Sequence, residues 1–173
     1  MEAFAEFVAA SYPGLVRTAY LLTGDRGHAE DLVQQCLLAT YRSWSRVDEP
    51  GAYVRASMAR LATRWRSRRW LGEVPTDPVP DARTDDPVAG VPEALAVRRA
   101  LGALPAAQRA VLVLRYFDDR SEAEIAEMLH CSVGTVKSRA SRALQSLRER
   151  GLLREPGDPL PTSALPRTGQ VRP

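Results

Sequence analysis

Histidine and cysteine, the side chains that most often hold metals or attack substrates, are scarce in this 173-residue chain. His28 and His130 stand alone, and Cys36 and Cys131 lie far apart and form no CxxC pair. The sequence has no Ser/His/Asp set, no glycine-rich phosphate loop and no cluster with metal-ligand spacing. We therefore expect a protein that is not an enzyme, with no cofactor and no metal. The thiols should be free and buried or half-buried, and the histidines should be helix caps or surface residues.

The remaining chemistry is positive charge, which is concentrated in two stretches. LHCSVGTVKSRASRAL, residues 129–144, has an apolar residue every three or four positions and no acid. Residues 50–72 contain six arginines and no acid, with Tyr53, Trp65 and Trp70 among them. Six like charges on one helix repel each other unless a polyanion is present, and arginine with aromatic rings suits single-stranded nucleic acid. The alternative is that the basic side chains are only solvated and that the aromatic residues belong to a core.

Composition and charge indicate a globular protein with two basic blocks. Hydrophobic residues make up 45% and charged residues 26% of the chain. Residues 1–72 hold ten basic and seven acidic side chains, residues 73–92 one and five, and residues 93–150 ten and seven. Two modules that meet an anionic partner are thus joined by a segment that does not. No apolar run reaches the roughly 20 residues that span a bilayer, and the start, MEAFAEF, is acidic where a signal peptide is basic. We expect a cytoplasmic protein with no membrane insertion.

The spacing of apolar residues predicts helices throughout. In the first block we expect helices over 4–22, where Pro13 marks a break or a first turn, and over 27–45, and a third from Pro50 to about Trp70. Gly24 suits a helix C-cap and Asp25 the next N-cap. The second block should contain helices over 93–102, from Pro105 to Phe117, over 121–129 and over 133–148. The fold class is all-α, with two small helical domains.

Two segments should lack regular structure. Residues 73–92 are rich in proline and aspartate and are expected to form an extended, flexible linker. Residues 151–173 have the same character and are expected to be a disordered tail.

The last two predicted helices have the pattern of a helix-turn-helix. Ser121 and Glu124 form a capping box, and Ser132 caps the final helix. One face of that helix is apolar and should pack on Ile125 and Leu129: Val136, Ala140, Ala143, Leu144 and Leu147. The opposite face is small, polar and basic: Gly134, Thr135, Lys137, Ser138, Ser141 and Arg142, with Arg139 at its side. Such a helix fits the DNA major groove, where Thr135 can bind a phosphate and Lys137 and Arg142 can reach guanine edges or the backbone.

The sequence resembles bacterial sigma factors of the extracytoplasmic-function group, within the sigma-70 family and close to a sigma-E-like subgroup common in actinobacteria. LPAAQRAVLVLRYFDDRSEAEIAEMLHCSVGTVKSRASRALQSLRE, at residues 104–149, is similar to the family's region 4. YLLTGDRGHAEDLVQQCLLATYRSW, at residues 20–44, is similar to its polymerase-binding region 2. Together the two regions cover nearly all of residues 4–150. His130 departs from the family, which usually has glycine there, and predicts a slightly strained turn.

The resemblance implies a role for each block. The first, residues 1–72, is a three-helix region 2 that binds core RNA polymerase and the −10 promoter element. The second, residues 93–150, is a four-helix region 4 that reads the −35 element. The implied function is that of an RNA polymerase sigma factor, which directs promoter-specific transcription initiation and assists promoter melting. The implied partners are promoter DNA, the β′ clamp helices and the β flap of core polymerase, with an anti-sigma factor as a further candidate.

The resemblance also assigns site residues. Those facing the −35 element are Thr135, Lys137, Ser138, Arg139, Ser141 and Arg142. Those facing the −10 element during melting are Tyr53, Arg55, Arg60, Arg64, Trp65 and Arg68. Arg60 takes a position where many relatives have asparagine, which leaves open the residue that holds the flipped base. Asp31, Gln34 and Gln35 on the second helix match the polymerase-docking face; without the resemblance they would be a solvated surface.

Three other functions compete with this interpretation. A self-sufficient repressor or response-regulator output module would need a dimer interface or a ligand domain, for which the first block offers no sign. An enzyme would need the catalytic groups that are missing. A helical adaptor that binds only protein would leave both basic faces unexplained.

Overall fold

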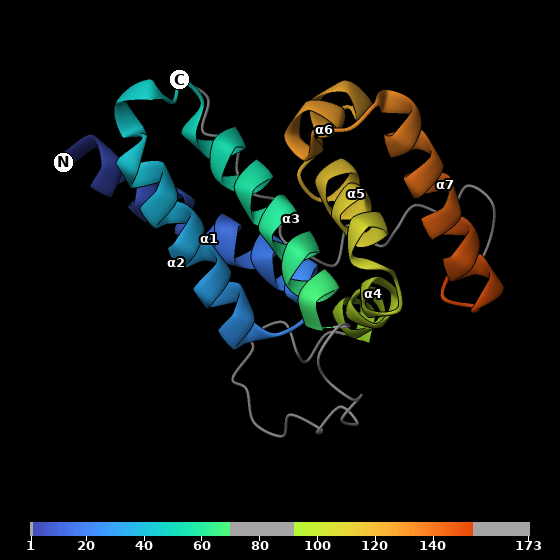
Figure 1. Ribbon diagram of the computed structural model, residues 1–173. Coiled ribbons are helices and arrows are strands. Elements are labelled where there is room, and N and C mark those ends of the chain that lie inside the picture. The colour runs from blue at the N-terminus through green and yellow to red at the C-terminus, as the bar shows by residue number, and fades with distance from the viewer. Residues whose placement is uncertain (1, 70–91, 154–173) are drawn as a thin grey trace.

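The computed structural model describes residues 2–69 and 92–153, and every regular element within these ranges is helical. The elements are α1 (Glu2–Thr23), α2 (Arg26–Arg42), the 3-10 turn η1 (Trp44–Arg46), α3 (Pro50–Arg69), α4 (Pro92–Gly102), α5 (Ala106–Tyr116), α6 (Glu122–Leu129) and α7 (Val133–Glu149). Figure 1 shows α3 in the middle, with α1 and α2 on one side and α5, α6 and α7 on the other. The expected all-α fold is confirmed.

The first unit, α1–α3, is the expected bundle of three helices. Leu15 of α1, Leu32 of α2 and Met58 of α3 are each 0% exposed, so the apolar stripes of all three helices meet in one core. An aromatic cluster joins α1 to the end of α2, where the ring centroid of Phe4 lies 5.0 Å from those of Tyr41 and Trp44. Packing of the predicted faces therefore positions the outer faces of α2 and α3.

The ends of α1 and α2 confirm the expected caps, but the break at Pro13 was wrong. Gly24 follows α1 with a φ of +78°, and the side chain of Asp25 accepts a hydrogen bond from the amide of His28 at 2.7 Å. The helix α1 continues through Pro13, which is exposed. Proline removes one helical hydrogen bond, and on the solvent side water can reach the carbonyl that this leaves.

The second unit, α4–α7, is built around α5. All residues from Arg109 to Leu114 are buried, as expected for a helix that is apolar nearly all round. The helix α6 begins with the predicted capping box of Ser121 and Glu124, and the side chain of Ser132 caps α7. These two caps set where α6 and α7 begin, and the cap at Ser132 also fixes the end of the turn between them.

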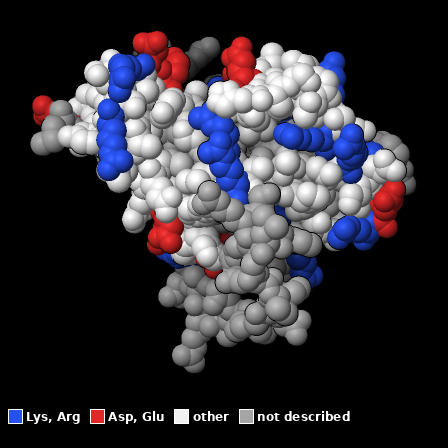
Figure 2. Space-filling view, in the orientation of Figure 1, with Lys and Arg blue, Asp and Glu red and all other residues white. Residues whose placement is uncertain are grey.

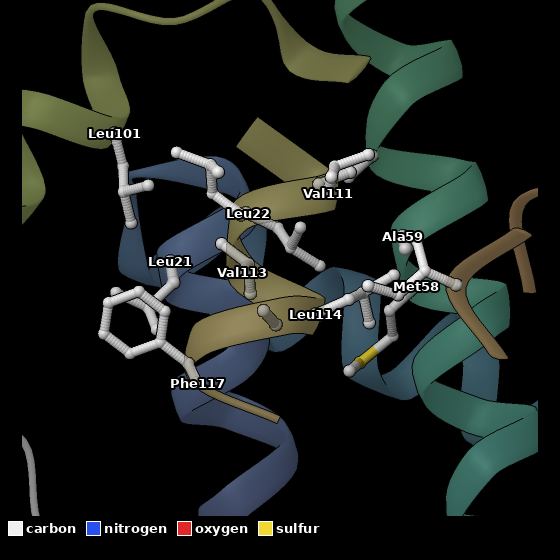
Figure 3. Close-up of a cluster of buried hydrophobic side chains, with 14 of the residues drawn as sticks. Leu21, Leu22, Met58, Ala59, Leu101, Val111, Val113, Leu114 and Phe117 are labelled. Atoms are coloured by element: carbon white, nitrogen blue, oxygen red, sulfur yellow. The ribbon is translucent and has the colours of Figure 1, made fainter. Parts of the chain in front are cut away.

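The two units are not separate bodies, which the sequence patterns did not predict. Figure 3 shows side chains from both in one buried cluster, with Leu21 and Leu22 of α1 and Met58 of α3 beside Val113 and Leu114 of α5. All five of these side chains are at most 7% exposed. The units therefore share a continuous core.

Most of the expected linker and tail lies outside the described residues. Of residues 73–92 only Pro92 is described, as the first residue of α4, and of residues 151–173 only the first three are described. Leu153, which follows α7, is buried. None of the described helices is long and apolar enough to cross a membrane.

Candidate nucleic-acid interface

Two helices and a turn of three residues form a helix-turn-helix at one end of the second unit. The turn between α6 and α7 is made by His130, Cys131 and Ser132. His130 has a φ of +51° and a ψ of 50°, the left-handed conformation that glycine adopts most easily. Its amide and that of Cys131 donate to carbonyls at the end of α6. The expected strained turn is therefore present, and its hydrogen bonds are made.

The predicted apolar face of α7 packs inward and leaves the polar face outward. Val136, Ala140, Ala143 and Leu147 are buried, and Leu144 is partly buried. On the other side Gly134, Lys137, Ser141 and Arg142 are exposed, whereas Thr135, Ser138 and Arg139 are half-buried. The structure thus brings the residues assigned to the −35 element together along one side of a single helix.

Local hydrogen bonds already use part of this face. The amide of Thr135 donates to the Ser132 hydroxyl at 3.1 Å, and the Ser138 hydroxyl donates to the Thr135 carbonyl at 3.0 Å. A phosphate at this helix terminus would therefore meet the backbone amides of Val133 and Gly134, because the first amides of a helix have no acceptor within it. The Lys137 ammonium lies 3.7 Å from Glu122 but remains 64% exposed, a pair too weak to hold it from a phosphate.

Two arginines of α3 that were expected to be uncompensated are held by groups of the second unit. Arg55 lies 3.4 Å from the Asp118 carboxylate and also donates to the Gly51 carbonyl. One guanidinium nitrogen of Arg60 lies 3.1 Å from the Met128 carbonyl and 2.8 Å from Nε2 of His130. The expectation that the acid-free helix carries unbalanced charge was therefore wrong for Arg55, because the acid comes from a distant part of the chain.

The other residues assigned to α3 divide between surface and core. Arg64 is exposed, and Tyr53 is 36% exposed. Trp65 is half-buried and packs on the core, which favours the structural role that the sequence left open. Arg68 belongs to α3, but its side chain lies outside the described residues.

The three α2 residues assigned to polymerase docking are all exposed on one face. Leu38 and Tyr41 continue that face at helical spacing and are 52% and 45% exposed. Single exposed apolar residues are normal on protein surfaces, so it is the combination of Leu38, Tyr41 and the three polar residues on one face that fits a docking surface. The signal in the sequence is Leu38 itself, an apolar residue outside the core stripe of α2.

Asp118 and Arg109 were also missed as residues that join the units. The Asp118 carboxylate accepts a hydrogen bond from the Thr18 hydroxyl at 2.9 Å. Arg109 is 1% exposed and donates to the carbonyls of Leu101, Gly102, Leu104 and, across the interface, Leu22 at 3.0 Å. No local pattern predicts the pairs Thr18–Asp118 and Leu22–Arg109, because their members lie 100 and 87 positions apart in the sequence.

The two cysteines are free, with Cys36 buried and Cys131 half-buried. Burial raises the pKa of the Cys36 thiol to about 11, although Arg60 opposes the shift. A thiol with so high a pKa is a poor nucleophile at neutral pH. The described residues contain no group of histidine, cysteine and carboxylate side chains that could hold a metal ion.

Figure 2 shows basic side chains over α3 and α7, with the acidic side chains mainly toward the edges of this view. Such a distribution attracts a polyanion to the side where both helices are accessible. It does not assign a sequence preference, which depends on contacts to base edges.

Comparison with known proteins places both units in one family. The model described as "Sigma-70 region 2" matches residues 7–71, and "Sigma-70, region 4" matches residues 94–147. The RNA polymerase sigma-E factor of Streptomyces avermitilis is 38% identical over 149 residues, which cover 84% of this chain and 83% of that protein. The ECF RNA polymerase sigma factor SigL of Mycobacterium tuberculosis is 35% identical, over 78% and 80% of the two chains.

A solved structure supports the fold. The sigma factor RpoE of Bartonella quintana, in complex with the anti-sigma factor NepR, matches with a TM-score of 0.65 over 90% of this chain and 100% of that one. The sequences are 23% identical, so this likeness concerns the arrangement of helices alone.

Proposed function

Because the chain belongs to the extracytoplasmic-function group of the sigma-70 family, we propose that it binds core RNA polymerase and directs transcription initiation from specific promoters. The observation that carries this proposal is the presence of both region 2 and region 4 on one chain, each matching a described helical unit. A protein that only binds DNA needs the helix-turn-helix but not the exposed α2 face. The protein acts in the cytoplasm, where the polymerase and the promoters are.

The α2 face binds the polymerase. Asp31, Gln34 and Gln35 supply polar contacts to the β′ clamp helices, and Leu38 adds an apolar contact at the centre of the same face. Exposed polar groups around one apolar anchor are typical of a protein interface. The second unit contacts the β flap.

The α7 face reads the −35 element. Lys137, Ser141 and Arg142 are the exposed side chains of this face, so they contact base edges and phosphates, whereas the half-buried Thr135, Ser138 and Arg139 position the helix. This division follows from exposure, since exposed side chains are the ones free to meet DNA.

The α3 face binds the −10 element. Tyr53 and Arg64 are accessible in this structure, and Arg55 and Arg60 become accessible when their partners in the second unit move away. Trp65 supports the helix from the core side, and Arg68 adds charge toward its end. Melting of the promoter is mechanical: a base leaves the stack and is held by contacts to the strand.

Run-off transcription tests the function. Purified core RNA polymerase is supplied with genomic DNA fragments from the source organism, with and without this protein. Discrete transcription starts that depend on the protein are expected, and their alignment identifies both promoter elements. DNA binding without core polymerase and no dependent start would contradict the proposal and favour a repressor.

A further inference from the structure

One carboxylate lies between two basic side chains at the start of the helix-turn-helix. The helices α5, α6 and α7 pack against one another (Figure 1), and Glu122 in the first turn of α6 contacts the other two helices. Its Oε1 accepts a hydrogen bond from Arg115 of α5 at 2.7 Å, and its Oε2 lies 3.7 Å from the ammonium of Lys137 on α7. Glu122 therefore brings a negative charge to the side of α7 that is otherwise small, polar and basic.

The two ion pairs of Glu122 differ in strength. The contact with Arg115 is a short, charge-assisted hydrogen bond between side chains that are 36% and 27% exposed, so it holds the carboxylate in place. The contact with Lys137 is longer, and the lysine side chain is 64% exposed, so salt and competing anions weaken it. Arg115 thus anchors the carboxylate, and Lys137 is the partner that can leave.

The start of α6 does not need Glu122 for its cap. The other acid of that turn, Glu124, closes the capping box with Ser121 and pairs with Arg120 at 3.0 Å. An acid in the first turn also favours a helix through the helix dipole, but this effect requires no lysine from the next helix. The contact with Lys137 is therefore a feature of the DNA-binding face and not of the helix end alone.

A lysine that keeps this contact is well placed to read a base. The ammonium group has three donors, so one side can face the carboxylate while the others meet O6 and N7 of a guanine in the major groove. Because Arg115 anchors the carboxylate to α5, the ammonium of Lys137 is restrained relative to the helix-turn-helix. A base edge has a fixed position too, and a side chain that is already restrained loses less freedom when it binds.

A phosphate is a different partner for the same lysine. Phosphates line the DNA backbone at every sequence and supply most of non-specific binding. To bind one, Lys137 has to leave Glu122, because the carboxylate and the phosphate are both anions and repel each other. Binding to the backbone therefore loses an ion pair that binding to a base edge retains.

From these observations we propose that Glu122 is a positioning residue that determines how well α7 distinguishes its own sequence from other DNA. It holds Lys137 for a base edge and makes a backbone contact of the same lysine less favourable. The proposal deepens the role that the proposed function gives to α7, and it rests on that function for the identity of the specific sequence. Its effect on other DNA can be measured without polymerase and without a promoter.

The first experiment measures binding of the whole chain to a duplex of mixed sequence. The variant is Glu122→Gln, whose amide oxygen still accepts from Arg115 while the negative charge is removed. We expect it to bind about two- to fivefold more tightly than the unaltered chain, the effect of one exposed ion pair. Log affinity should also fall more steeply with log salt, by up to about 0.9, the value for one phosphate contact.

The control is Glu127→Gln, the same change of charge at an exposed position of α6. It should bind the mixed duplex as the unaltered chain does, and an equal gain in both variants would overturn the proposal. Circular dichroism checks the fold of each variant. A purely structural role of Glu122 predicts the opposite sign, since a loss of fold weakens binding, so unchanged or weaker binding of Glu122→Gln would also overturn the proposal.

A double-variant cycle shows whether Glu122 acts through Lys137. In a Lys137→Ala background the ammonium is gone, so Glu122→Gln should change binding to the mixed duplex no more than Glu127→Gln does. A full gain in the absence of the lysine would mean that the carboxylate acts on DNA directly or through Arg115. That result would overturn the assignment of Glu122 as the residue that positions Lys137.

The last experiment compares specific with mixed DNA in the holoenzyme. A promoter that run-off transcription identifies competes with the mixed duplex, and the ratio of the two affinities should fall about two- to fivefold in Glu122→Gln, because mixed DNA binds better. The ratio should not change in Glu127→Gln, and an unchanged ratio in Glu122→Gln would overturn the proposal. If run-off transcription finds no promoter, the proposed function fails, whereas the experiments on mixed DNA still decide whether Glu122 acts through Lys137.

Discussion

At the scale of single residues, the recognition helix offers a direct test of base contact. Arg142 is exposed on the polar face of α7, and Arg148 is exposed about 1.7 turns farther along the helix. We expect Arg142→Ala to weaken binding of the holoenzyme to its −35 element by roughly 1–3 kcal/mol, the range for a good arginine contact to guanine. Promoter protection measures this effect. If Arg148→Ala weakens binding as much, general charge and not readout explains the result.

The strained turn makes a prediction about stability. His130 has a positive φ, so His130→Gly should raise the free energy of unfolding by about 1 kcal/mol. Loss of the exposed contact between His130 and Arg60 offsets this gain only slightly. His130→Ala loses the same contact but keeps the backbone strain, so it should not be stabilised. Urea unfolding of the three chains checks the prediction, and equal gains in both variants would exclude relief of strain as the cause.

At the scale of elements, the start of α6 depends on its capping box. Ser121 Oγ accepts from the Glu124 amide at 3.2 Å, and Glu124 Oε2 accepts from the Ser121 amide at 2.8 Å. Ser121→Ala should lower the free energy of unfolding by about 1 kcal/mol. Chemical denaturation measures this loss, and Glu127→Gln, an exposed position on the same helix, is the control. An equal loss in the control would mean that the cap is not the cause.

The same cap gives a pH dependence. Its hydrogen bonds from Ser121 lower the pKa of Glu124 to about 2, from an ordinary value of 4.5. A carboxyl with a lowered pKa contributes stability above its unfolded pKa, and the contribution is lost as the pH falls from about 4.5 toward 2. Glu124→Gln should therefore flatten this part of the pH profile of unfolding. A profile as steep as that of the unaltered chain would contradict this assignment.

The proposed function requires the exposed face of α2, because this face binds core polymerase. Replacement of Asp31 and Gln34 together by alanine should weaken binding to core polymerase, because both side chains project from that face. Circular dichroism should be unchanged, since neither residue belongs to the core. Glu6→Ala, at an exposed position on α1, is the control. Unaltered affinity of the double variant for core polymerase would move the docking face elsewhere.

At the scale of the whole molecule, a buried carboxyl between the two units makes the stability of the fold depend on pH in the opposite direction. Burial raises the pKa of Asp118 above its ordinary value of 3.8, although Arg55, Thr18 and Arg120 oppose the shift. Its Oδ2 has no hydrogen-bond partner among the described residues. A carboxyl with a raised pKa stabilises the fold below pH 3.8, and this contribution is lost as the pH rises through the raised pKa.

Asp118→Asn should therefore be tolerated. The amide keeps the shape of the side chain and an acceptor for Thr18, and it removes a charge whose burial is unfavourable. We expect stability at neutral pH equal to or above that of the unaltered chain, and a flatter profile above pH 4. Thermal unfolding across that range measures both. A large loss at neutral pH would show that the ion pair with Arg55 outweighs desolvation.

Local patterns predicted the helices well and their assembly poorly. Caps such as Asp25, Ser121 and Ser132 depend on neighbours three residues away, so the sequence is sufficient to find them. The apolar stripe of α7 was likewise sufficient to predict which of its faces is exposed. Leu22 and Met58 also fit an apolar stripe, but periodicity does not say which helix covers it. Their contact with α5, and the pairing of Arg55 with Asp118, depend on residues far along the chain.

The shared core also has a consequence for synthesis on the ribosome. Leu21, Leu22, Met58 and Ala59 lie in the cluster that α5 completes, and α5 ends at Tyr116. The 47 residues after Arg69 must be added before that helix is complete, which takes on the order of 2–10 s at about 5–20 residues per second. During that interval the nascent first unit presents an apolar face with no partner, so it is the stage at which a chaperone would bind this chain.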